Sequence, residues 1–231
     1  EIYMKRLLRV IENLIVKYQN YKILKFLNEK NTENILDVGG HHAEFYKAFI
    51  ENNIDFSSYM IFEPFPESFE IINKIEDSRL KKFNLGVGEN KSSMTFNVSE
   101  WETSNTFSEV DVNTFKNKLK KVIYRTDPYV AKLEVQVDSL DNICLKLEKT
   151  FDVLKIDVEG FELNVLKGAN LLLSSNLIRY IVIEIQKEGS YLDYSPLEIE
   201  KYLDNKGFKL EKTFKILGLG IEDRIYKNTN I

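Results

Sequence analysis

Residues 154–168, LKIDVEGFELNVLKG, join a short apolar run to an amphipathic one across two carboxylates and a glycine. The run 151–157 is typical of a buried strand, and 162–173 is typical of a helix. Asp157 and Glu159 therefore stand where a strand passes into a helix. In open α/β sheets, ligands bind outside the carboxyl ends of the strands. This stretch predicts a strand–loop–helix unit whose carboxylates face a ligand.

The rest of the chain repeats this alternation of short apolar runs and amphipathic segments. Ser195 is expected to cap one helix, with Pro196 in its first turn and Gly207 at its end. The repeated pattern predicts a doubly wound α/β sheet, closed at the C terminus by an antiparallel hairpin. Strands are expected at 33–40, 58–64, 80–88, 151–157, 178–186, 208–216 and 222–228, and helices at 43–53, 66–77, 162–173 and 195–207.

The N-terminal segment differs from this alternation because it contains no strand pattern. Residues 3–28 predict one or two amphipathic helices. We therefore treat residues 1–30 as an N-terminal helical extension of the domain. The apolar residues that share one stripe of this helix are Leu7, Val10, Ile11, Leu14 and Ile15.

The middle of the chain interrupts the domain that spans 31–231. Residues 92–99 and 132–140 alternate like strands, but the polar stretch between them is too long for an ordinary connection. We predict that about 99–130 is an inserted lid, with aromatic faces for stacking and polar groups for hydroxyls. Its candidate contact residues are Trp101, Asn105, Phe107, Tyr124 and Tyr129.

Composition restricts the class of protein. With 231 residues, 43% of them hydrophobic, the chain can bury a sizeable core. A formal net charge of -4 gives no reason to expect a nucleic-acid partner. Cys144 is the single cysteine and lies in an apolar helical context, so we expect a buried thiol. No stretch approaches the ~20 apolar residues of a membrane span, and the expected compartment is the reducing cytoplasm.

The end of the first predicted strand carries a glycine-rich turn, DVGGHHA, at residues 37–43. Glycines there let the backbone approach a ligand, and a third small residue, Ala43, lets the helix pack on the strand. Glu63 ends the next predicted strand, 26 positions after Asp37. A carboxylate at that place can accept both hydroxyls of an adenosine ribose. The structural alternative is that Glu63 caps the helix that follows Pro64.

Two cofactor classes fit this pair of strand ends. A dinucleotide places its pyrophosphate on a helix N-terminus, typically behind a G-x-G-x-x-G loop, whereas this loop has bulky residues after Gly40. Asp37 stands before the loop, where a carboxylate repels pyrophosphate and suits a cation. S-adenosylmethionine carries an ammonium and a sulfonium, so it is favoured over a nicotinamide cofactor, which stays the alternative.

Five stretches together resemble a known family. ILDVGGHHAEF, IFEPFPESFEII, NLGVGENKSSMTF, VDSLDN and LKIDVEGFELNVLKGA are similar, in order and spacing, to motifs of FkbM-type S-adenosylmethionine-dependent methyltransferases over residues 33–186. The resemblance implies the class I methyltransferase (Rossmann-like) fold, a seven-stranded, mostly parallel sheet with an antiparallel last strand and helices on both faces. One departure is His41-His42-Ala43, where family members usually carry Asn, a branched residue and Gly.

The resemblance also implies an activity: O-methylation of macrolides, of capsular or lipopolysaccharide sugars, or of related small molecules. We expect a hydroxyl of a sugar or glycan precursor, nucleotide-linked sugars included, as the acceptor. The alternatives are a non-sugar small molecule, or a cofactor-binding domain without catalysis. The expected cofactor-binding residues are Asp37, Gly39, Gly40, His41, Phe45, Glu63, Pro64, Asn84, Gly86 and Asp157.

Methyl transfer to an alcohol requires that its proton be removed, by a base or through a metal. Asp157, beside the methionine end of the cofactor, is the first candidate base. His41 and His42, the only two histidines, are the second, because a helix N-terminus keeps an imidazole neutral. Asp157 and Glu184 could share a divalent metal.

The turn after Asp157 has two interpretations. Glu159 and Glu162 either belong to the site or only shape the start of the helix, where acidic residues favour the helix dipole. No Asp/Asn-Pro-Pro-Tyr/Phe motif, which accepts the exocyclic amines of nucleic-acid bases, follows the strand that ends at Asp157. Its absence disfavours a DNA or RNA methyltransferase.

Overall fold

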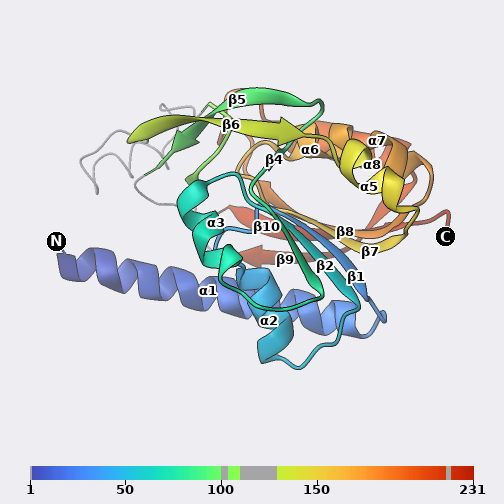
Figure 1. Cartoon of the computed structure of the whole chain (residues 1–231), viewed down its shortest axis with the longest axis horizontal. Helices are drawn as coiled ribbons and strands as arrows, with labels where there is room; N and C mark the ends of the chain where they lie inside the picture. The colour runs from blue at the N-terminus through green and yellow to red at the C-terminus, as the bar shows by residue number, and fades with distance from the viewer. Residues whose placement is uncertain (1, 100–103, 110–128, 217–219) are drawn as a thin grey trace.

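A seven-stranded sheet forms the centre of the molecule (Figure 1). The computed structural model describes residues 2–99, 104–109, 129–216 and 220–231. The strand order is β3-β2-β1-β7-β8-β10-β9. Strand β10 runs antiparallel to both of its neighbours, and the other pairings in this sheet are parallel, which confirms the predicted fold class. The strands are β1 (Asn34–Val38), β2 (Ser58–Phe62), β3 (Leu80–Phe83), β7 (Phe151–Ile156), β8 (Ile178–Gln186), β9 (Phe208–Ile216) and β10 (Ile221–Asn228).

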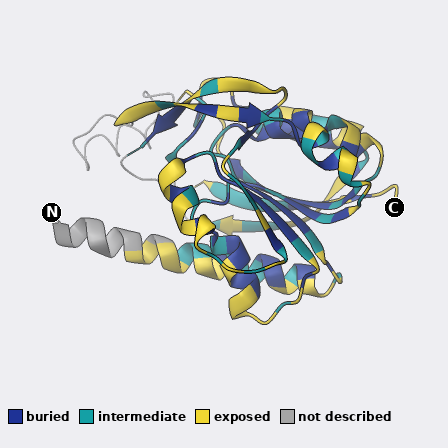
Figure 2. Cartoon of the chain, in the orientation of Figure 1, coloured by how far each residue is buried: buried dark blue, intermediate teal, exposed yellow. Residues whose placement is uncertain are grey.

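Helices cover both faces of this sheet, so that its central strands β1, β2, β7 and β8 are largely buried between two layers, whereas the edge strand β9 is mostly exposed (Figure 2). One face packs against α1 (Ile2–Asn28), α2 (Glu44–Glu51) and α3 (Pro66–Asn73). The other face packs against α5 (Leu140–Cys144), α6 (Glu162–Gly168), α7 (Asn170–Ser174) and α8 (Pro196–Asn205), with a short 3-10 helix, η2 (Leu145–Leu147), after α5.

The two-residue period of a strand divides the apolar side chains between the two layers. Ile35 and Tyr59 lie in the cluster with α1 and α2, whereas Leu36 and Met60 lie in the cluster with α5 to α8. Both sets are buried, which explains why the strands read as continuous apolar runs. Cys144 is fully buried in the second cluster, as expected, and burial raises the pKa of its thiol to about 12.

The N-terminal segment forms one helix, and only part of it packs on the domain. Ile23, Leu24 and Leu27 are buried in the same cluster as α2. By contrast Val10 and Leu14, in the predicted apolar stripe, are 54% and 62% exposed. The apolar periodicity therefore predicted the helix correctly. The residues that pack against the domain, however, lie later in the helix than Val10 and Leu14. In the described part of the chain, no helix is both long and apolar enough to cross a membrane.

A second, three-stranded sheet accounts for the middle of the chain. It has the order β4-β6-β5, with bounds β4 (Gly86–Val87), β5 (Ser92–Val98) and β6 (Ala131–Asp138). The strand predicted at 80–88 is thus divided between two sheets. Most of the predicted lid, including Trp101 and Tyr124, lies outside the described residues. Residues 104–109 are described, and Thr106 pairs with Asn97 of β5.

The predicted helix ends agree with the structure where capping residues determine them. The Ser195 side chain accepts a hydrogen bond from the backbone N–H of Glu198, and Pro196 opens α8. This helix ends at Asn205, two residues before Gly207. Pro66 likewise opens α3.

Candidate active site at the carboxyl ends of the strands

A cavity of about 440 Å³ lies at the carboxyl ends of β1, β2, β7 and β8. Its volume is within the usual range for small-molecule sites. Among the described residues, Asp37, Asn84 and His42 are predicted site residues that do not line it. The predicted residues that do line it are Gly39, Gly40, His41, Phe45, Glu63, Pro64, Gly86, Asp157 and Glu184.

The loop after β1 runs directly against the loop after β7. Gly39 has φ +81, and a Cβ added there would lie 1.8 Å from the carbonyl oxygen of Asp157. The backbone N–H groups of Gly39 and Gly40 both donate to the carbonyl of Phe62, at 3.1 and 3.0 Å. The first glycine is therefore required by a backbone conformation that L side chains rarely adopt and by a close approach of two main chains.

Glu63 is held in place by two backbone amides. Its Oε2 accepts from His41 N at 2.7 Å and its Oε1 from Phe65 N at 2.8 Å. Burial raises the pKa of Glu63 to about 7, although these two hydrogen bonds lower it. Asn84 donates from Nδ2 to the Glu63 carbonyl at 2.9 Å, so it supports the strand end from outside the cavity. Each carboxylate oxygen of Glu63 retains lone-pair capacity for a further donor.

Asp37 lies beneath the loop. Its side chain is fully buried, and its Oδ2 accepts a 2.6 Å hydrogen bond from the Tyr59 hydroxyl. Its Oδ1 lies 3.3 Å from Lys155 Nζ. Burial raises the pKa of Asp37, and the Lys155 ammonium opposes that shift. Asp37 does not line the cavity, but its carboxylate pairs with Lys155, and Lys155 does line the cavity.

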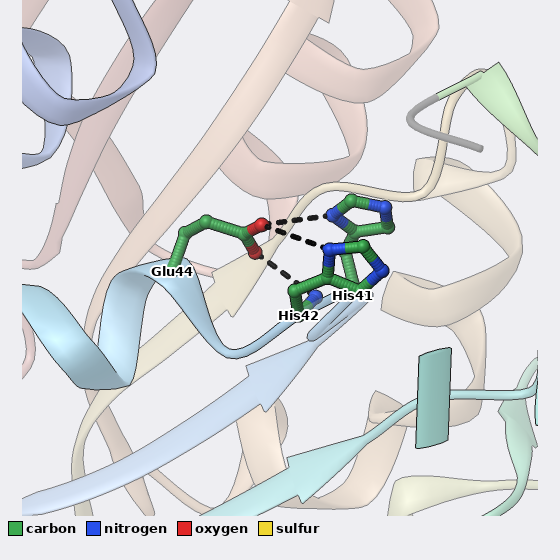
Figure 3. A group of neighbouring side chains, drawn as sticks. All are labelled: His41, His42 and Glu44. Atoms are coloured by element: carbon green, nitrogen blue, oxygen red, sulfur yellow. Dashed lines mark hydrogen bonds and ion pairs between the residues drawn. The ribbon is translucent and has the colours of Figure 1, made fainter. Parts of the chain in front are cut away.

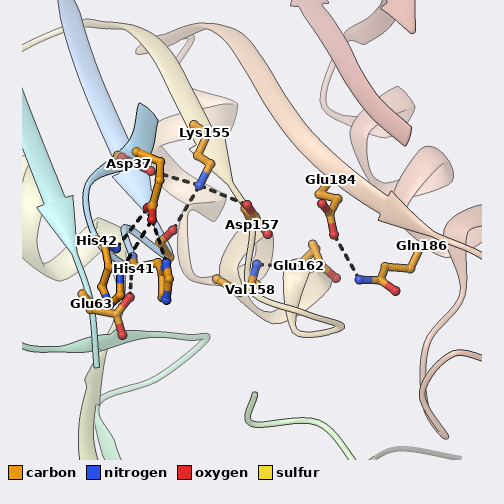
Figure 4. A network of polar contacts seen from close by, with 12 residues as sticks. Asp37, His41, His42, Glu63, Lys155, Asp157, Val158, Glu162, Glu184 and Gln186 are labelled. Atoms are coloured by element: carbon orange, nitrogen blue, oxygen red, sulfur yellow. Dashed lines mark hydrogen bonds and ion pairs between the residues drawn. The ribbon is translucent and has the colours of Figure 1, made fainter. Parts of the chain in front are cut away.

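Lys155 connects the two loops (Figure 4). Its Nζ lies 3.3 Å from Asp157 Oδ2 and donates to the Gly39 carbonyl at 3.0 Å. Burial lowers the pKa of Lys155, but Asp37 and Asp157 more than reverse this and raise it above its usual range. Among the described residues that line the cavity, Lys155 is the only lysine or arginine. Lys155 was not among the predicted site residues, although its charge inside the apolar run FDVLKID was a usable signal.

Sheet register explains how these three charges meet. Asp37 pairs with Lys155 across β1 and β7, and side chains opposite one another in neighbouring strands share a face. Asp157 follows Lys155 by two residues and so lies on the same face. The Asp157 side chain is 39% exposed, because it stands just past the strand end where Asp37 does not.

The β7 loop carries further carboxylates. Glu159 Oε2 accepts from Gln186 Nε2 at 2.7 Å and from the Tyr191 hydroxyl. Glu162 is fully buried, its Oε1 accepts from Gly160 N at 3.0 Å, and burial raises its pKa to about 8. Glu159 belongs to the cavity lining, whereas Glu162 does not and instead stabilises the turn through its hydrogen bond with Gly160.

Glu184 of β8 lines the same cavity and accepts a 3.0 Å hydrogen bond from Gln186 Nε2. Burial raises the pKa of Glu184 well above its usual range, and the neighbouring charges of Asp157 and Glu159 add to this. In the described part of the chain, the one cluster of three potential metal ligands does not include Glu184 or Asp157.

That cluster consists of His41, His42 and Glu44, at the start of α2 (Figure 3). The two imidazole rings are stacked, with centroids 3.8 Å apart and planes 19° from parallel. His41 Nδ1 lies 3.0 Å from Glu44 Oε1. Burial raises the pKa of Glu44, but the hydrogen bond and charge of His41, a backbone hydrogen bond and the charge of His42 together outweigh burial, and the pKa falls to about 2. The cavity lining contains His41 and Glu44 but not His42.

The small sheet closes another side of the cavity. Phe96 of β5 and Phe107 line it, with ring centroids 4.8 Å apart, and Asn105 lies beside them in the lining. Thr106 Oγ1 donates to the Glu159 carbonyl at 2.6 Å and so joins the segment 104–109 to the β7 loop. Tyr129 donates from its hydroxyl to the Ser108 carbonyl at 3.1 Å, and Tyr129 is not in the lining.

Solved structures share this architecture. The methyltransferase FkbM from Methylobacillus flagellatus aligns with a TM-score of 0.57 and 16% identity over 85% of this chain and 43% of its own. This chain therefore spans less than half of that protein's length. The methyltransferase domain of bacterial CtHen1-C aligns with a TM-score of 0.53 and 8% identity, over 92% of this chain and 98% of its own. At these identities the likeness shows the fold.

Sequence comparison is more specific. No curated protein matches the chain significantly. The model of the methyltransferase FkbM domain matches residues 37–210, which is more than half of the chain and includes the strand ends that form the cavity. The chain therefore belongs to the methyltransferase FkbM domain family.

Proposed function

We propose that this chain is an S-adenosylmethionine-dependent O-methyltransferase whose acceptor is a hydroxyl of a sugar or glycan precursor. The observation that carries the proposal is a single cavity that contains Glu63 and Asp157, at the ends of two parallel strands. The Glu63 carboxylate is placed to accept hydrogen bonds from the hydroxyls of a ribose. The Asp157 carboxylate is placed to take the proton of a reacting hydroxyl. The family assignment supports methyl transfer as the class of reaction.

The residues of the β1 and β2 loops fit the cofactor. A Cβ at Gly40 would lie 2.3 Å from Ile61, and one at Gly39 would meet the Asp157 backbone, so this wall of the cavity is bare main chain. Glu63 would accept the ribose hydroxyls, and the acidic lining suits a cationic ligand. When bound, the cofactor supplies the electrophilic methyl group on a sulfonium.

The remaining lining fits a polyol. Asp157, Glu159 and Glu184 offer carboxylate oxygens that accept hydrogen bonds from hydroxyls. Phe96 and Phe107 place aromatic surface on the side closed by the small sheet. Small-molecule sites combine such apolar walls with a few convergent polar groups. This combination favours a sugar over a flat, apolar acceptor.

Asp157 is the residue to which we assign proton removal from the acceptor hydroxyl. Its side chain is 39% exposed toward the cavity, and its Oδ2 pairs with Lys155 at 3.3 Å. Lys155 acts as a positioning residue, because it also holds the Gly39 carbonyl of the cofactor loop. His41 lines the cavity too and is the second candidate, but its Nδ1 is engaged with Glu44.

Calorimetry with S-adenosylhomocysteine tests the cofactor half of the proposal. Wild-type protein should bind, and Glu63→Ala should lose the signal. Because Ala leaves the amides of His41 and Phe65 without this partner, its melting temperature should fall, and circular dichroism verifies that it is folded at the temperature of the titration. Glu67→Ala, on the exposed side of α3, is the matched control and should bind normally. Wild-type protein that does not bind at millimolar concentration would exclude the proposed activity.

Transfer of a labelled methyl group tests the acceptor half. The panel should contain free sugars, nucleotide-linked sugars, glycan fragments and non-sugar alcohols. We expect incorporation into a sugar hydroxyl. Incorporation only into a non-sugar alcohol would support O-methyl transfer and exclude a sugar as the acceptor. Cofactor binding with no transfer to any acceptor would indicate a cofactor-binding domain without catalysis.

A further inference from the structure

We propose that His41, His42 and Glu44 form a binding site for one divalent transition-metal ion, such as Zn²⁺, at the edge of the cofactor cavity. This site is separate from the acceptor carboxylates, and it does not depend on the reaction proposed above. Two imidazoles and one carboxylate are ligands that Zn²⁺ takes in proteins.

The side chains already converge. One potential ligand atom from each of the three residues lies within 4.8 Å of the others. Glu44 Oε1 is 3.0 Å from His41 Nδ1 and 3.9 Å from His42 Nδ1. Ligand atoms around a tetrahedral zinc lie roughly 3.3 Å apart, given metal–ligand distances of about 2.0 Å. To reach that spacing with both nitrogen lone pairs directed at one ion, the two imidazole rings must rotate out of their stacked arrangement, and the partly exposed side chains leave room for this rotation.

The backbone brings the two rings to the same side. In an extended chain, consecutive side chains point in opposite directions. Here His41 has φ 43 and Ala43 has φ 62, both in the left-handed region. His41 and His42 consequently stack, and Glu44, the first residue of α2, faces both rings (Figure 3).

The site has room for water as well as metal. The side chains of His41, His42 and Glu44 are 23%, 30% and 38% exposed. Three protein ligands with an open fourth position is the arrangement of zinc sites that keep an exchangeable ligand. Since His41 N also holds the Glu63 carboxylate, a metal on His41 would fix the residue that positions the proposed ribose contact.

The chain is favourable for a direct test, because these are its only two histidines. Zn²⁺ alone is titrated by calorimetry into protein stripped of metal, and the imidazole ¹H–¹⁵N signals are followed by NMR. We expect one equivalent to bind and both histidine signals to shift together. If neither signal moves at saturating Zn²⁺, the site does not exist.

Variants separate this site from general surface binding. His42→Asn and Glu44→Gln should each weaken Zn²⁺ binding by at least about tenfold, since even indirect partners of a metal ligand cost that much. The control is Glu51→Gln, which removes an exposed carboxylate at the other end of the same helix. Equal Zn²⁺ affinity in wild type and both site variants, or an equal loss in Glu51→Gln, would overturn the proposal. Circular dichroism and melting temperature verify that each variant is folded.

Discussion

The chain has similar features at the carboxyl ends of β1 and β7, but the aspartates at the two places have different roles. Each strand has an aspartate in its last two residues or just after its end, followed by a glycine in the left-handed region and a helix. Asp37 is fully buried, whereas the Asp157 side chain is 39% exposed in the cavity. Asp37 belongs to β1 and pairs with Lys155, but Asp157 stands one residue past the end of β7. A displacement of two residues along a strand thus separates a structural carboxylate from a proposed catalytic one.

The sharpest test of this difference is Asp157→Asn, which keeps the shape of the side chain and removes its charge. We expect the rate of methyl transfer to fall by roughly 10²–10⁴, the usual effect of losing an acid–base group. Affinity for S-adenosylhomocysteine should change far less than in Glu63→Ala, because the ribose contact is intact. Full activity in Asp157→Asn would transfer the role of base to the histidine pair. Single-turnover kinetics and calorimetry on the same samples provide both numbers.

Lys155→Met breaks the connection between the two loops. It leaves Asp37 buried beside an apolar side chain, and removing one partner of a buried ion pair costs about 3–5 kcal/mol. Urea unfolding should therefore show a large loss of stability. Lys81→Met, at an exposed position of β3, is the control and should be close to neutral. Equal stability of the two variants would mean that Asp37 is neutral without Lys155.

The glycines of the two loops differ in what surrounds them. Gly39→Ala would place a Cβ against the Asp157 backbone, and Gly160→Ala would place one 2.4 Å from the Tyr191 ring. Both residues have positive φ, so each substitution also carries backbone strain of about 1–3 kcal/mol. A backbone cannot move aside as a ring can, so Gly39→Ala should lose more stability. Thermal unfolding of both variants measures the order, and the reverse order would contradict the close contact between the loops.

Glu162 supplies a smaller effect that depends on pH. Burial raises its pKa to about 8 in the folded chain, against 4.5 for an ordinary glutamate. The folded state thus binds the proton more tightly, and the resulting stability is lost as the pH rises toward 8. Between pH 6 and pH 8, Glu162→Gln should gain on wild type by about 1–3 kcal/mol, at about 1.4 kcal/mol per pH unit. Urea unfolding at several pH values measures this difference in stability, and because the other acidic residues are the same in both proteins, their contributions cancel. If the free energies of unfolding of the two proteins ran parallel against pH, Glu162 would ionise like an ordinary glutamate.

The fold was predictable because its signals are local. The alternation of apolar runs and amphipathic segments, the cap at Ser195 and the glycine turn after β1 each depend on neighbouring residues. Most of the predicted cofactor residues also line the cavity, because strand ends gather at one edge of a parallel sheet. The apolar stripe at Val10 and Leu14 shows the limit, since periodicity predicts a helix but not which residues contact the sheet.

Local patterns along the chain were enough to predict the α/β class, the family motifs and the set of acidic residues that end the strands. The contacts of Lys155 with Asp37 and Asp157, and the division of residues 80–88 between two sheets, became visible only in the folded chain. Those facts depend on which strands become neighbours and in what register. That choice follows from burying whole faces against segments far apart in the chain, and no local pattern contains it.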